Sequence, residues 1–292
     1  MYALAKNLRL GIACRSRNRA PFRGRERLLR TTDRLLRTFD RSRIETDIAG
    51  VRFRLDTEDL IDFRLAYCGV HQSELIDYIS TRIRHGAFTI WDVGANVGSI
   101  SLLLAARHPN ASIHAFEPSP AVFARLAANG RCNPELSSRI GLHQVALSNE
   151  SRQVRFFSSS EPFNSGVGGL GPSHNRQDTP VEVAAKSGDD LIESGALPSP
   201  SLIKIDVEGF ELEVLQGLER FLRRSWGVEV VFENEPYRLR ERALDKHVVV
   251  EHLVKLGFEI RQNAERGTTA SLSESILDRT CDLVALKPAG GQ

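Results

Sequence analysis

The chain has 292 residues, 41% of them hydrophobic and 26% charged, and a formal net charge of +2, which are ordinary values for a globular protein. The four cysteines (Cys14, Cys68, Cys132, Cys281) lie far apart and form no CxxC pair, which argues against a zinc site or a disulfide scaffold and predicts a reducing, cytoplasmic location. The sequence contains no run of 18 apolar residues, so we expect no membrane-spanning helix. The first 30 residues also lack the continuous apolar segment of a secretory signal.

The beginning of the chain carries most of the positive charge. Residues 1–43 contain 13 Lys and Arg against three Asp and Glu, a net charge of +10, whereas the remaining 249 residues carry −8. Residues 24–41 place leucines and Phe39 at helical spacing between arginines, which predicts an amphipathic helix. We interpret residues 1–45 as a basic helical extension. Three roles stay open for it: a solvated helix packed loosely on the body, a surface for an anionic membrane or nucleic acid, and a transit peptide.

Residues 46–88 predict a lead-in to the main domain. The sequence IAGVRFRL, residues 48–55, predicts a short β-hairpin that runs into an irregular segment as far as residue 67. A helix is expected from about Ser73 to Arg84, with Ser73 as its N-cap.

From Thr89 onward, short apolar runs alternate with helical stretches. We expect seven strands, at residues 89–94, 112–118, 142–148, 202–209, 228–234, 258–262 and 281–287, and helices at 100–107, 121–130, 211–222 and 247–256. This alternation is typical of parallel strands with helices on both faces. We therefore predict an α/β fold, a Rossmann-like seven-stranded and mostly parallel sheet, in a domain at residues 89–288. The last two strands have no helix between them, which favours an antiparallel pair there.

An insertion, residues 154–190, separates the third strand from the fourth. It holds two strand-like pieces, VRFF and VEVAA, around a long loop rich in Ser, Gly and Pro, and such loops inside compact domains are usually functional or disordered. The loop contains a literal G-x-G-x-x-G at residues 166–171, but no helix follows it. We therefore reject it as a dinucleotide site and interpret it as a flexible loop.

A glycine-rich loop, DVGANVG from Asp92 to Gly98, closes the first strand and opens a helix. Gly94 and Gly98 permit a tight turn and close approach of a ligand, and the helix start offers free N–H groups to an anion. Glu117 ends the second strand, where an acid can accept hydrogen bonds from both ribose hydroxyls. The glycine spacing differs from that of the NAD fingerprint. The alternative is an ordinary turn beside an exposed strand end.

Three charged residues, Lys204, Asp206 and Glu208, alternate at the end of the fourth strand. On a continuing strand they would share one face, and charges on an interior strand are costly unless they are paired or functional. We take Asp206 as the first catalytic candidate and Glu208 as the second, with Lys204 tuning Asp206 through its positive charge. The alternative is a salt-bridged support for the helix that follows.

Together with Asn129 and the segment IKIDVEGFE at 203–211, these motifs resemble the FkbM-type methyltransferases, which are S-adenosylmethionine-dependent enzymes of the Rossmann-like class I group. The resemblance covers roughly residues 67–236 and leaves the basic extension outside. It implies the following positions around the cofactor: Asp92, Gly94, Asn96 and Gly98 at its methionine end, Glu117 at the ribose, Ala146 and Leu147 near the adenine, and Glu74 helping to close the site.

The resemblance implies an S-adenosylmethionine-dependent methyltransferase that O-methylates a hydroxyl of a sugar or small metabolite. Asp206 would orient or deprotonate that hydroxyl. Two alternatives stay open: an RNA or protein methyltransferase that docks through the basic N-terminus, and a non-catalytic cofactor-binding module. We do not expect nucleic acid as the partner, because the body carries a net charge of −8. An anionic membrane surface stays open as a partner of the extension.

Several further patterns compete for a function. Asn234-Glu235-Pro236-Tyr237 is similar to the N-P-P-Y motif of amino-methyltransferases, but it follows the fifth strand instead of the fourth, so we interpret it as a turn. Asp206 and the pair Glu233-Asn234 offer oxygen donors suited to Mg²⁺ or Ca²⁺, although the family does not require a metal and we expect none. The histidines at 71, 114, 143, 174, 247 and 252 show no ligand spacing.

Overall fold

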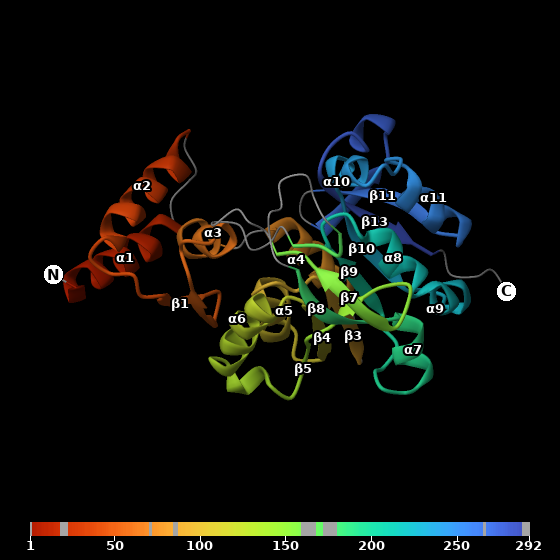
Figure 1. Ribbon diagram of the computed structural model, residues 1–292, viewed down its shortest axis with the longest axis horizontal. Helices are drawn as coiled ribbons and strands as arrows, with labels where there is room; N and C mark the ends of the chain where they lie inside the picture. The colour runs from red at the N-terminus through yellow and green to blue at the C-terminus, as the bar shows by residue number, and fades with distance from the viewer. Residues whose placement is uncertain are drawn as a thin grey trace.

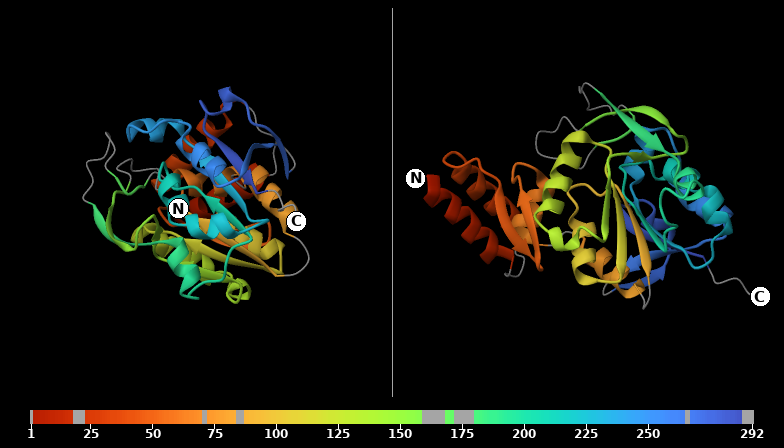
Figure 2. Two further views of the ribbon diagram at one scale, coloured as in Figure 1. Left: turned by 90° about the vertical axis from the view of Figure 1, so that its right-hand side faces the viewer. Right: turned by 90° about the horizontal axis from the view of Figure 1, so that it is seen from below.

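The computed structural model describes residues 2–17, 23–69, 72–83, 87–158, 168–171, 180–264 and 267–287. A small N-terminal lobe stands beside a larger α/β body (Figures 1 and 2). The lobe consists of α1 (Tyr2–Arg17), α2 (Arg25–Arg37), the hairpin β1 (Ile44–Ile48) and β2 (Val51–Leu55), and α3 (Leu60–Cys68). Within the described ranges no helix is long and apolar enough to cross a bilayer.

The body is built on a sheet with the strand order β12-β11-β13-β10-β9-β3-β4-β5. Its strands are β3 (Phe88–Val93), β4 (Ala111–Phe116), β5 (Ile140–His143), β9 (Leu202–Ile205), β10 (Glu229–Asn234), β11 (Glu259–Ala264), β12 (Thr268–Ser271) and β13 (Cys281–Leu286). The five strands from β10 to β5 pair in parallel, whereas β13 is antiparallel to both β10 and β11, as the missing helix predicted. The predicted count of seven strands is short by one, because β12 is a polar, largely exposed TTAS segment with no apolar pattern.

Helices cover both faces of this sheet, as the alternation predicted. On one face lie α4 (Ser73–Arg82) and α5 (Ser99–Arg107), and on the other α8 (Glu211–Gln216), α9 (Glu219–Arg224) and α11 (Val248–Lys255). The central strand β3 serves both layers, since Ile90 packs with the first group and Trp91 with the second. Interior parallel strands are therefore apolar on both sides.

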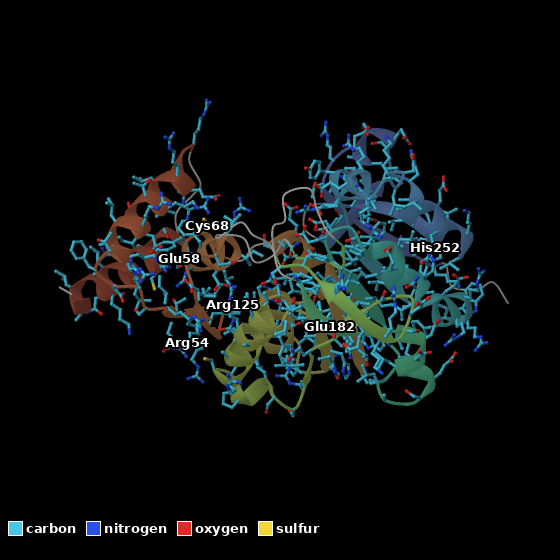
Figure 3. The ribbon with its side chains drawn as sticks, viewed as in Figure 1. Arg54, Glu58, Cys68, Arg125, Glu182 and His252 are labelled. Carbon is cyan, nitrogen blue, oxygen red and sulfur yellow. The ribbon has the colours of Figure 1, made fainter. Side chains whose placement is uncertain are left out.

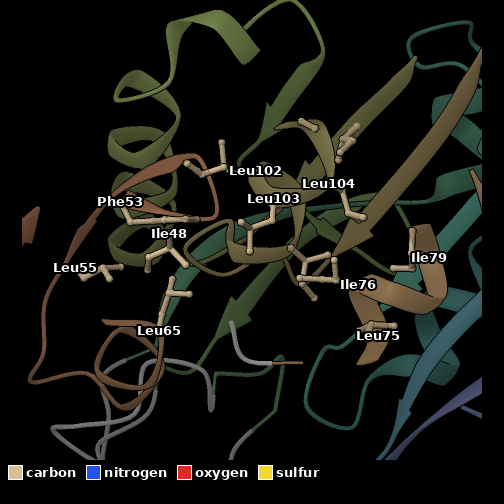
Figure 4. Close-up of a cluster of buried hydrophobic side chains, with 14 of the residues drawn as sticks. Ile48, Phe53, Leu55, Leu65, Leu75, Ile76, Ile79, Leu102, Leu103 and Leu104 are labelled. Carbon is tan, nitrogen blue, oxygen red and sulfur yellow. The ribbon is translucent and has the colours of Figure 1, made fainter. Parts of the chain in front are cut away.

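The first of these layers continues into the lobe. Figure 4 shows Phe53 and Leu55 of the hairpin and Leu65 of α3 beside Leu102 and Leu103 of α5, all within one buried cluster. The lobe and the body therefore share a hydrophobic core instead of meeting at a solvated boundary. The predicted boundary at residue 45 falls inside β1.

Three elements differ from the sequence prediction. The segment after the hairpin is the helix α3, capped by Asp59, not an irregular stretch. The N-cap of α4 is Gln72, so the assignment of Ser73 was wrong by one position. The predicted helix at 211–222 breaks at Gly217, where a Cβ would lie 2.0 Å from the carbonyl oxygen of Ser148.

The third predicted strand divides between two sheets. Its first half is β5, and its second half, β6 (Ala146–Leu147), joins β7 (Arg152–Phe156) and β8 (Val181–Lys186) of the insertion in a three-stranded sheet with the order β6-β8-β7. The remaining described elements are α6 (Pro120–Arg131), α7 (Gly188–Glu193), α10 (Pro236–Glu241) and two 3₁₀ turns at 134–136 and 274–276. The insertion thus builds a second, smaller sheet near the edge of the first.

The basic extension packs through a buried arginine. Arg9 of α1 is fully buried; it forms ion pairs of 3.0 Å with both Asp33 and Asp40 and donates a hydrogen bond of 2.8 Å to Thr57 Oγ1. Tyr67 of α3 donates a hydrogen bond of 2.5 Å to the same Asp33. The first of the three open roles, a solvated and loosely packed helix, therefore does not describe α1, since these contacts join α1 to α2, to the loop after β2 and to α3.

Polar side chains of α6 connect the body to the lobe. Arg125, labelled between the two parts in Figure 3, lies 2.7 Å from Asp62, whose pKa burial raises to about 7 against the opposing effect of Arg125. Asn129 is buried, accepts a hydrogen bond from Arg54 N at 2.8 Å and donates one to Val97 O at 2.9 Å. Asn129 therefore ties the hairpin to the glycine-rich loop and has a structural role.

Candidate active site

A cavity opens at the carboxyl ends of the parallel strands, where ligands bind in doubly wound sheets. Its walls come from the ends of β3, β4, β9 and β10, from β6, from the insertion, and from the lobe side through α3 and the start of α4. The lining residues include Ile61, Gln72, Gly94, Asn96, Glu117, Ala146, Leu147, Phe156, Gly168, Gly169, Leu170, Lys204, Asp206, Glu208 and Glu233. Most of the predicted site residues are thus brought together in one place.

Both loop glycines have positive φ, as the predicted tight turn requires, and each also has a steric role in packing. Gly94 has φ +78°, and a Cβ there would lie 1.8 Å from the carbonyl oxygen of Asp206. Gly98 has φ +85° and packs on Leu126 of α6, and it does not line the cavity. Position 94 therefore requires glycine because the carbonyl group of Asp206, directly after β9, lies so close to it, whether or not a ligand is bound.

Glu117 and Asn96 form the polar floor of the cavity. The Glu117 carboxylate accepts hydrogen bonds from the backbone N–H groups of Asn96, at 3.1 Å, and Ser119, at 2.9 Å. Burial raises the pKa of Glu117 to about 7, although these two hydrogen bonds act to lower it. Asn96 has φ +50°, and its buried side-chain oxygen has no hydrogen-bond partner among the described residues. An unsatisfied buried oxygen of this kind points to a ligand that donates a hydrogen bond.

Beneath the loop lies a buried charge pair. Asp92 is fully buried, accepts a hydrogen bond of 2.5 Å from Ser101 Oγ and lies 3.1 Å from Lys204 Nζ. Lys204 also donates to the carbonyl oxygen of Gly94 at 2.9 Å and lies 3.5 Å from Asp206 Oδ2. Burial alone would lower the pKa of Lys204, but Asp92 and Asp206 outweigh it and raise that pKa. The pair fixes the loop against β9, and Asp92 does not line the cavity.

Asp206 and Glu208 follow the end of β9 and both face the cavity. The Asp206 side chain is 23% exposed, and Gln72 Nε2 lies 3.5 Å from its carboxylate. Glu208 has φ +56°, so the strand alternation does not extend to it, and its carboxylate lies 3.2 Å from Arg238. Burial, together with Glu235 and Asp206, raises the pKa of Glu208 to about 9.

Glu233 lies at the end of β10, and the sequence indicates for it only a role as an oxygen donor to a metal ion. It lines the cavity, and burial together with the negative charge of Asp206 raises its pKa to about 11, so its carboxyl group is protonated at neutral pH. A hydrogen bond links it to Asp206. The structure therefore brings two carboxyl groups, Glu233 and Asp206, into hydrogen-bond contact at the cavity.

Of the oxygen donors considered for a metal, Asn234 does not join Asp206 and Glu233. Asn234 lies on the opposite face of β10 from Glu233 and donates hydrogen bonds to the carbonyl oxygens of Leu277, at 3.4 Å, and Arg279, at 2.8 Å. Among the residues that the structure describes, no group of three or more His, Cys, Asp or Glu side chains has an arrangement for a metal ion.

The insertion contributes a wall of the cavity whose individual residues the sequence did not identify. Phe156 of β7 and residues 168–170 line the cavity, as Ala146 and Leu147 do, and Gly168 packs directly on the Phe156 ring. The glycines of the rejected dinucleotide motif are thus partly accounted for by packing, while residues 166, 167 and 172–175 lie outside the described residues. The length of the loop was the only signal of this role.

Other predicted positions lie elsewhere. Glu74 is exposed on the first turn of α4 and does not line the cavity, whereas Gln72 does. The Asn234–Tyr237 segment is not a turn, because Pro236 begins the helix α10. Of the histidines, His114 and His143 form a pair with 3.0 Å between their ring nitrogens on β4 and β5, and residues 71 and 174 lie outside the described residues.

Known proteins resemble the chain over its body. The family profile described as "Methyltransferase FkbM domain" matches residues 92–260. The hexuronic acid methyltransferase AglP of Haloferax volcanii is 36% identical over 134 residues, which cover 46% of this chain and 51% of that protein. The 31-O-demethyl-FK506 methyltransferase FkbM of Streptomyces tacrolimicus is 29% identical over 168 residues, with 47% of this chain and 64% of that protein covered. The chain therefore spans about half to two thirds of the length of these relatives.

Solved structures resemble the chain more distantly. Magnesium protoporphyrin IX methyltransferase ChlM from Synechocystis PCC 6803, with bound S-adenosylmethionine, has a TM-score of 0.40 and 11% identity, and the match covers 73% of this chain and 76% of that chain. An S-adenosylmethionine-dependent O-methyltransferase from Thermotoga maritima has a TM-score of 0.41 and 11% identity, with 76% and 68% covered. The family match extends over more than half of the sequence, including both the glycine-rich loop and the end of β9. The chain therefore belongs to the FkbM methyltransferase family, as its motifs predicted.

Proposed function

We propose that the protein is an S-adenosylmethionine-dependent O-methyltransferase that acts on a hydroxyl of a sugar or small metabolite. One observation carries this proposal: the polar floor of Glu117 and Asn96 and the carboxylate of Asp206 line the same cavity. A cofactor held on the floor and an acceptor held at Asp206 would therefore meet within one enclosed space.

The residues present fit the cofactor. Glu117 uses one hydrogen bond per carboxylate oxygen, which leaves further lone pairs for ribose hydroxyls, and the unpartnered oxygen of Asn96 suits the ammonium group of the methionine end. Ala146 and Leu147 offer an apolar wall for the adenine. When bound, S-adenosylmethionine supplies a methyl group that its sulfonium has already activated.

The protein's own task is then to orient the acceptor and remove its proton. Asp206 is the group for this, because its carboxyl group is partly exposed to the cavity and lies 3.5 Å from Lys204 Nζ. The protonated Glu233 holds the Asp206 carboxylate in place through their hydrogen bond. Glu208 lies 3.2 Å from Arg238 and stands second, because burial raises its pKa to about 9 and it is mostly protonated at neutral pH.

The names of the relatives support a hydroxyl acceptor. AglP is a hexuronic acid methyltransferase, and a 2-O-methyltransferase, NoeI of Sinorhizobium fredii, is 29% identical over 148 residues, covering 47% of this chain and 59% of that protein. The NoeI name describes transfer to an oxygen, which agrees with a carboxylate as the proton acceptor, and the AglP name gives a sugar acid, which has hydroxyl groups and a carboxyl group.

The test is transfer of labelled methyl from S-adenosylmethionine to a panel of acceptors: hexuronic acid glycosides, neutral glycosides, total RNA and protein, alongside a calorimetric titration of the cofactor. We expect micromolar cofactor binding and label in a glycoside fraction, at an oxygen. Label in RNA or protein would contradict the acceptor class. Cofactor binding without transfer to any fraction would favour a non-catalytic module.

A further inference from the structure

We propose that the N-terminal lobe docks on an anionic lipid bilayer through helix α2. The helix buries Leu29, Asp33 and Arg37, which are spaced by four residues and face the lobe. Its opposite side exposes Leu28, which is 58% exposed, and Leu35, which is 63% exposed, one heptad apart. Phe39, 56% exposed and directly after the helix, extends the same line. These apolar side chains have no partner in the described chain.

An arginine ladder runs beside this apolar line. Arg27, Arg30, Arg34, Arg37 and Arg41 follow one another at intervals of three or four residues and line a single groove between α2 and the start of α3. Arg37 is paired with Asp56 and Glu58, and Arg30 lies over the Phe63 ring at 5.6 Å. Within the described residues, the other three guanidinium groups of the ladder have no ion pair, so they are free to bind phosphate groups of lipids.

Helix α1 adds to the same lobe two further exposed leucines, Leu4 at 72% and Leu8 at 48%, one turn apart. Of the nine large hydrophobic side chains that are exposed in the described residues, five belong to the first 39 positions. Exposed apolar residues and arginines without an ion pair thus belong to the same small lobe within the described residues. This combination is typical of helices that lie in the plane of a membrane interface.

The charge of the whole chain sets the orientation. Residues 1–43 carry +10 and the rest of the chain −8, so an anionic surface attracts the lobe and repels the body. Figures 1 and 2 show α1 and α2 at one end of the long axis, where the lobe can approach a plane without obstruction by the body.

The exposed leucines favour lipid over nucleic acid. A nucleic-acid surface would use the arginines and an aromatic side chain on which bases stack, but it would gain nothing from four exposed leucines. A bilayer takes both, because the leucines enter the acyl boundary while the arginines stay at the headgroups. The proposal does not depend on the methyltransferase reaction.

The test is flotation of the full-length protein with vesicles of pure phosphatidylcholine and of phosphatidylcholine with 30% phosphatidylglycerol, at roughly 150 mM and 500 mM salt. We expect binding to the anionic vesicles, weaker binding at the higher salt, and little binding to the neutral ones. The variant Leu28→Ser/Leu35→Ser should lower the partition coefficient about tenfold or more, because it removes apolar surface that would enter the bilayer. Both side chains are exposed, so the variant should keep its fold. The variant Arg27→Gln/Arg34→Gln/Arg41→Gln should lower it roughly 100-fold.

Matched controls lie on the body. Val254→Ser replaces an exposed apolar residue, and Arg131→Gln/Arg155→Gln/Arg224→Gln replaces three exposed arginines, so both should bind as the wild type does. Equal losses of vesicle binding in the lobe and body variants would show that binding does not depend on the lobe, and would overturn the proposal. Wild-type binding in the leucine variant, binding to neutral vesicles alone, or tight RNA binding without vesicle binding would also overturn it.

Discussion

At the scale of single residues, the site is governed by how burial changes the charge of carboxyl groups. Glu117 is buried and its pKa is about 7, so roughly half of it is ionised at neutral pH, whereas an exposed glutamate would be fully ionised. Hydrogen bonds from ribose hydroxyls favour the ionised form. Cofactor binding and ionisation of Glu117 are therefore linked.

We predict that cofactor affinity rises with pH through about 7 in the wild type. In Glu117→Gln the affinity should be lower by about 1.5–3 kcal/mol at pH 8, since a charge-assisted hydrogen bond is lost, and should vary little between pH 6 and 8. Calorimetric titration at three pH values measures both. An unchanged affinity in the variant would place the cofactor elsewhere.

The next prediction concerns Gly94. Gly94→Ala combines the strain of positive φ with a Cβ placed 1.8 Å from Asp206 O, so we expect a loss of about 2–5 kcal/mol in the free energy of unfolding. Gly195 is the matched control, because it has φ +70° and no atom within 4 Å of the added Cβ. Gly195→Ala should lose only the strain, about 1–2 kcal/mol. Equal losses in urea unfolding would show that β9 does not press on the loop.

At the scale of elements, the sequence predicted what depends on periodicity and missed what depends on distant contacts. The strand–helix alternation placed β3, α5, β4 and the start of β9 correctly because interior parallel strands are continuously apolar, but the predicted strand 202–209 ends at Ile205. The break at Gly217 could not be predicted, since it results from packing on Ser148, about 70 positions away in the sequence. The burial of Arg9 was likewise hidden, because its partners lie in other elements and arginines in a basic segment usually face solvent.

We predict that Arg9 is essential for the lobe. Arg9→Ala leaves Asp33 and Asp40 buried without their cation and should lower the free energy of unfolding by about 3–5 kcal/mol. Arg15→Ala, on the exposed side of the same helix, should change it by less than about 0.5 kcal/mol. Urea unfolding monitored by circular dichroism distinguishes the two. Equal stability of both variants would restore the interpretation of a loosely attached extension.

At the scale of the whole molecule, the candidate site combines segments that the sequence placed separately. The glycine-rich loop, Glu117 and Asp206 were predicted because they end parallel strands, and such ends meet at one edge of the sheet. Gln72, Phe156 and the wall at 168–170 come from the lead-in and the insertion, whose position follows from tertiary packing alone. The contact between Asp206 and Glu233, and the raised pKa of Glu233, depend on burial that the sequence does not show.

These buried carboxyl groups make stability depend on pH. The pKa values of Glu208, about 9, and Glu233, about 11, are raised in the folded state, so their contribution is fully present below about pH 4.5 and is lost as pH rises toward those values. Burial lowers the pKa of His143 to about 4. Its effect on the free energy of unfolding has the opposite pH dependence, because stability is lost as pH falls from about 6.5 toward 4.

We predict that the free energy of unfolding declines between pH 7 and 9, and that Glu233→Gln makes this decline shallower. Glu182→Gln, on the exposed side of β8 (Figure 3), should leave the decline unchanged. Urea unfolding at pH 7, 8 and 9 gives the three slopes. The same slope in wild type and Glu233→Gln would show that Glu233 is ionised in the native protein.

The most direct test of the central claim is Asp206→Asn, measured as cofactor affinity and as single-turnover methyl transfer to the acceptor fraction found in the screen. If Asp206 is the base in the cavity lined by Glu117 and Asn96, the variant's affinity for S-adenosylmethionine should stay within about twofold of the wild type. Its rate of methyl transfer should fall about 10²–10⁴-fold. Asp190→Asn, on an exposed helix of the body, controls for the loss of a carboxylate. A full transfer rate in Asp206→Asn with a lowered melting temperature would contradict the account and leave Asp206 as a structural partner of Lys204.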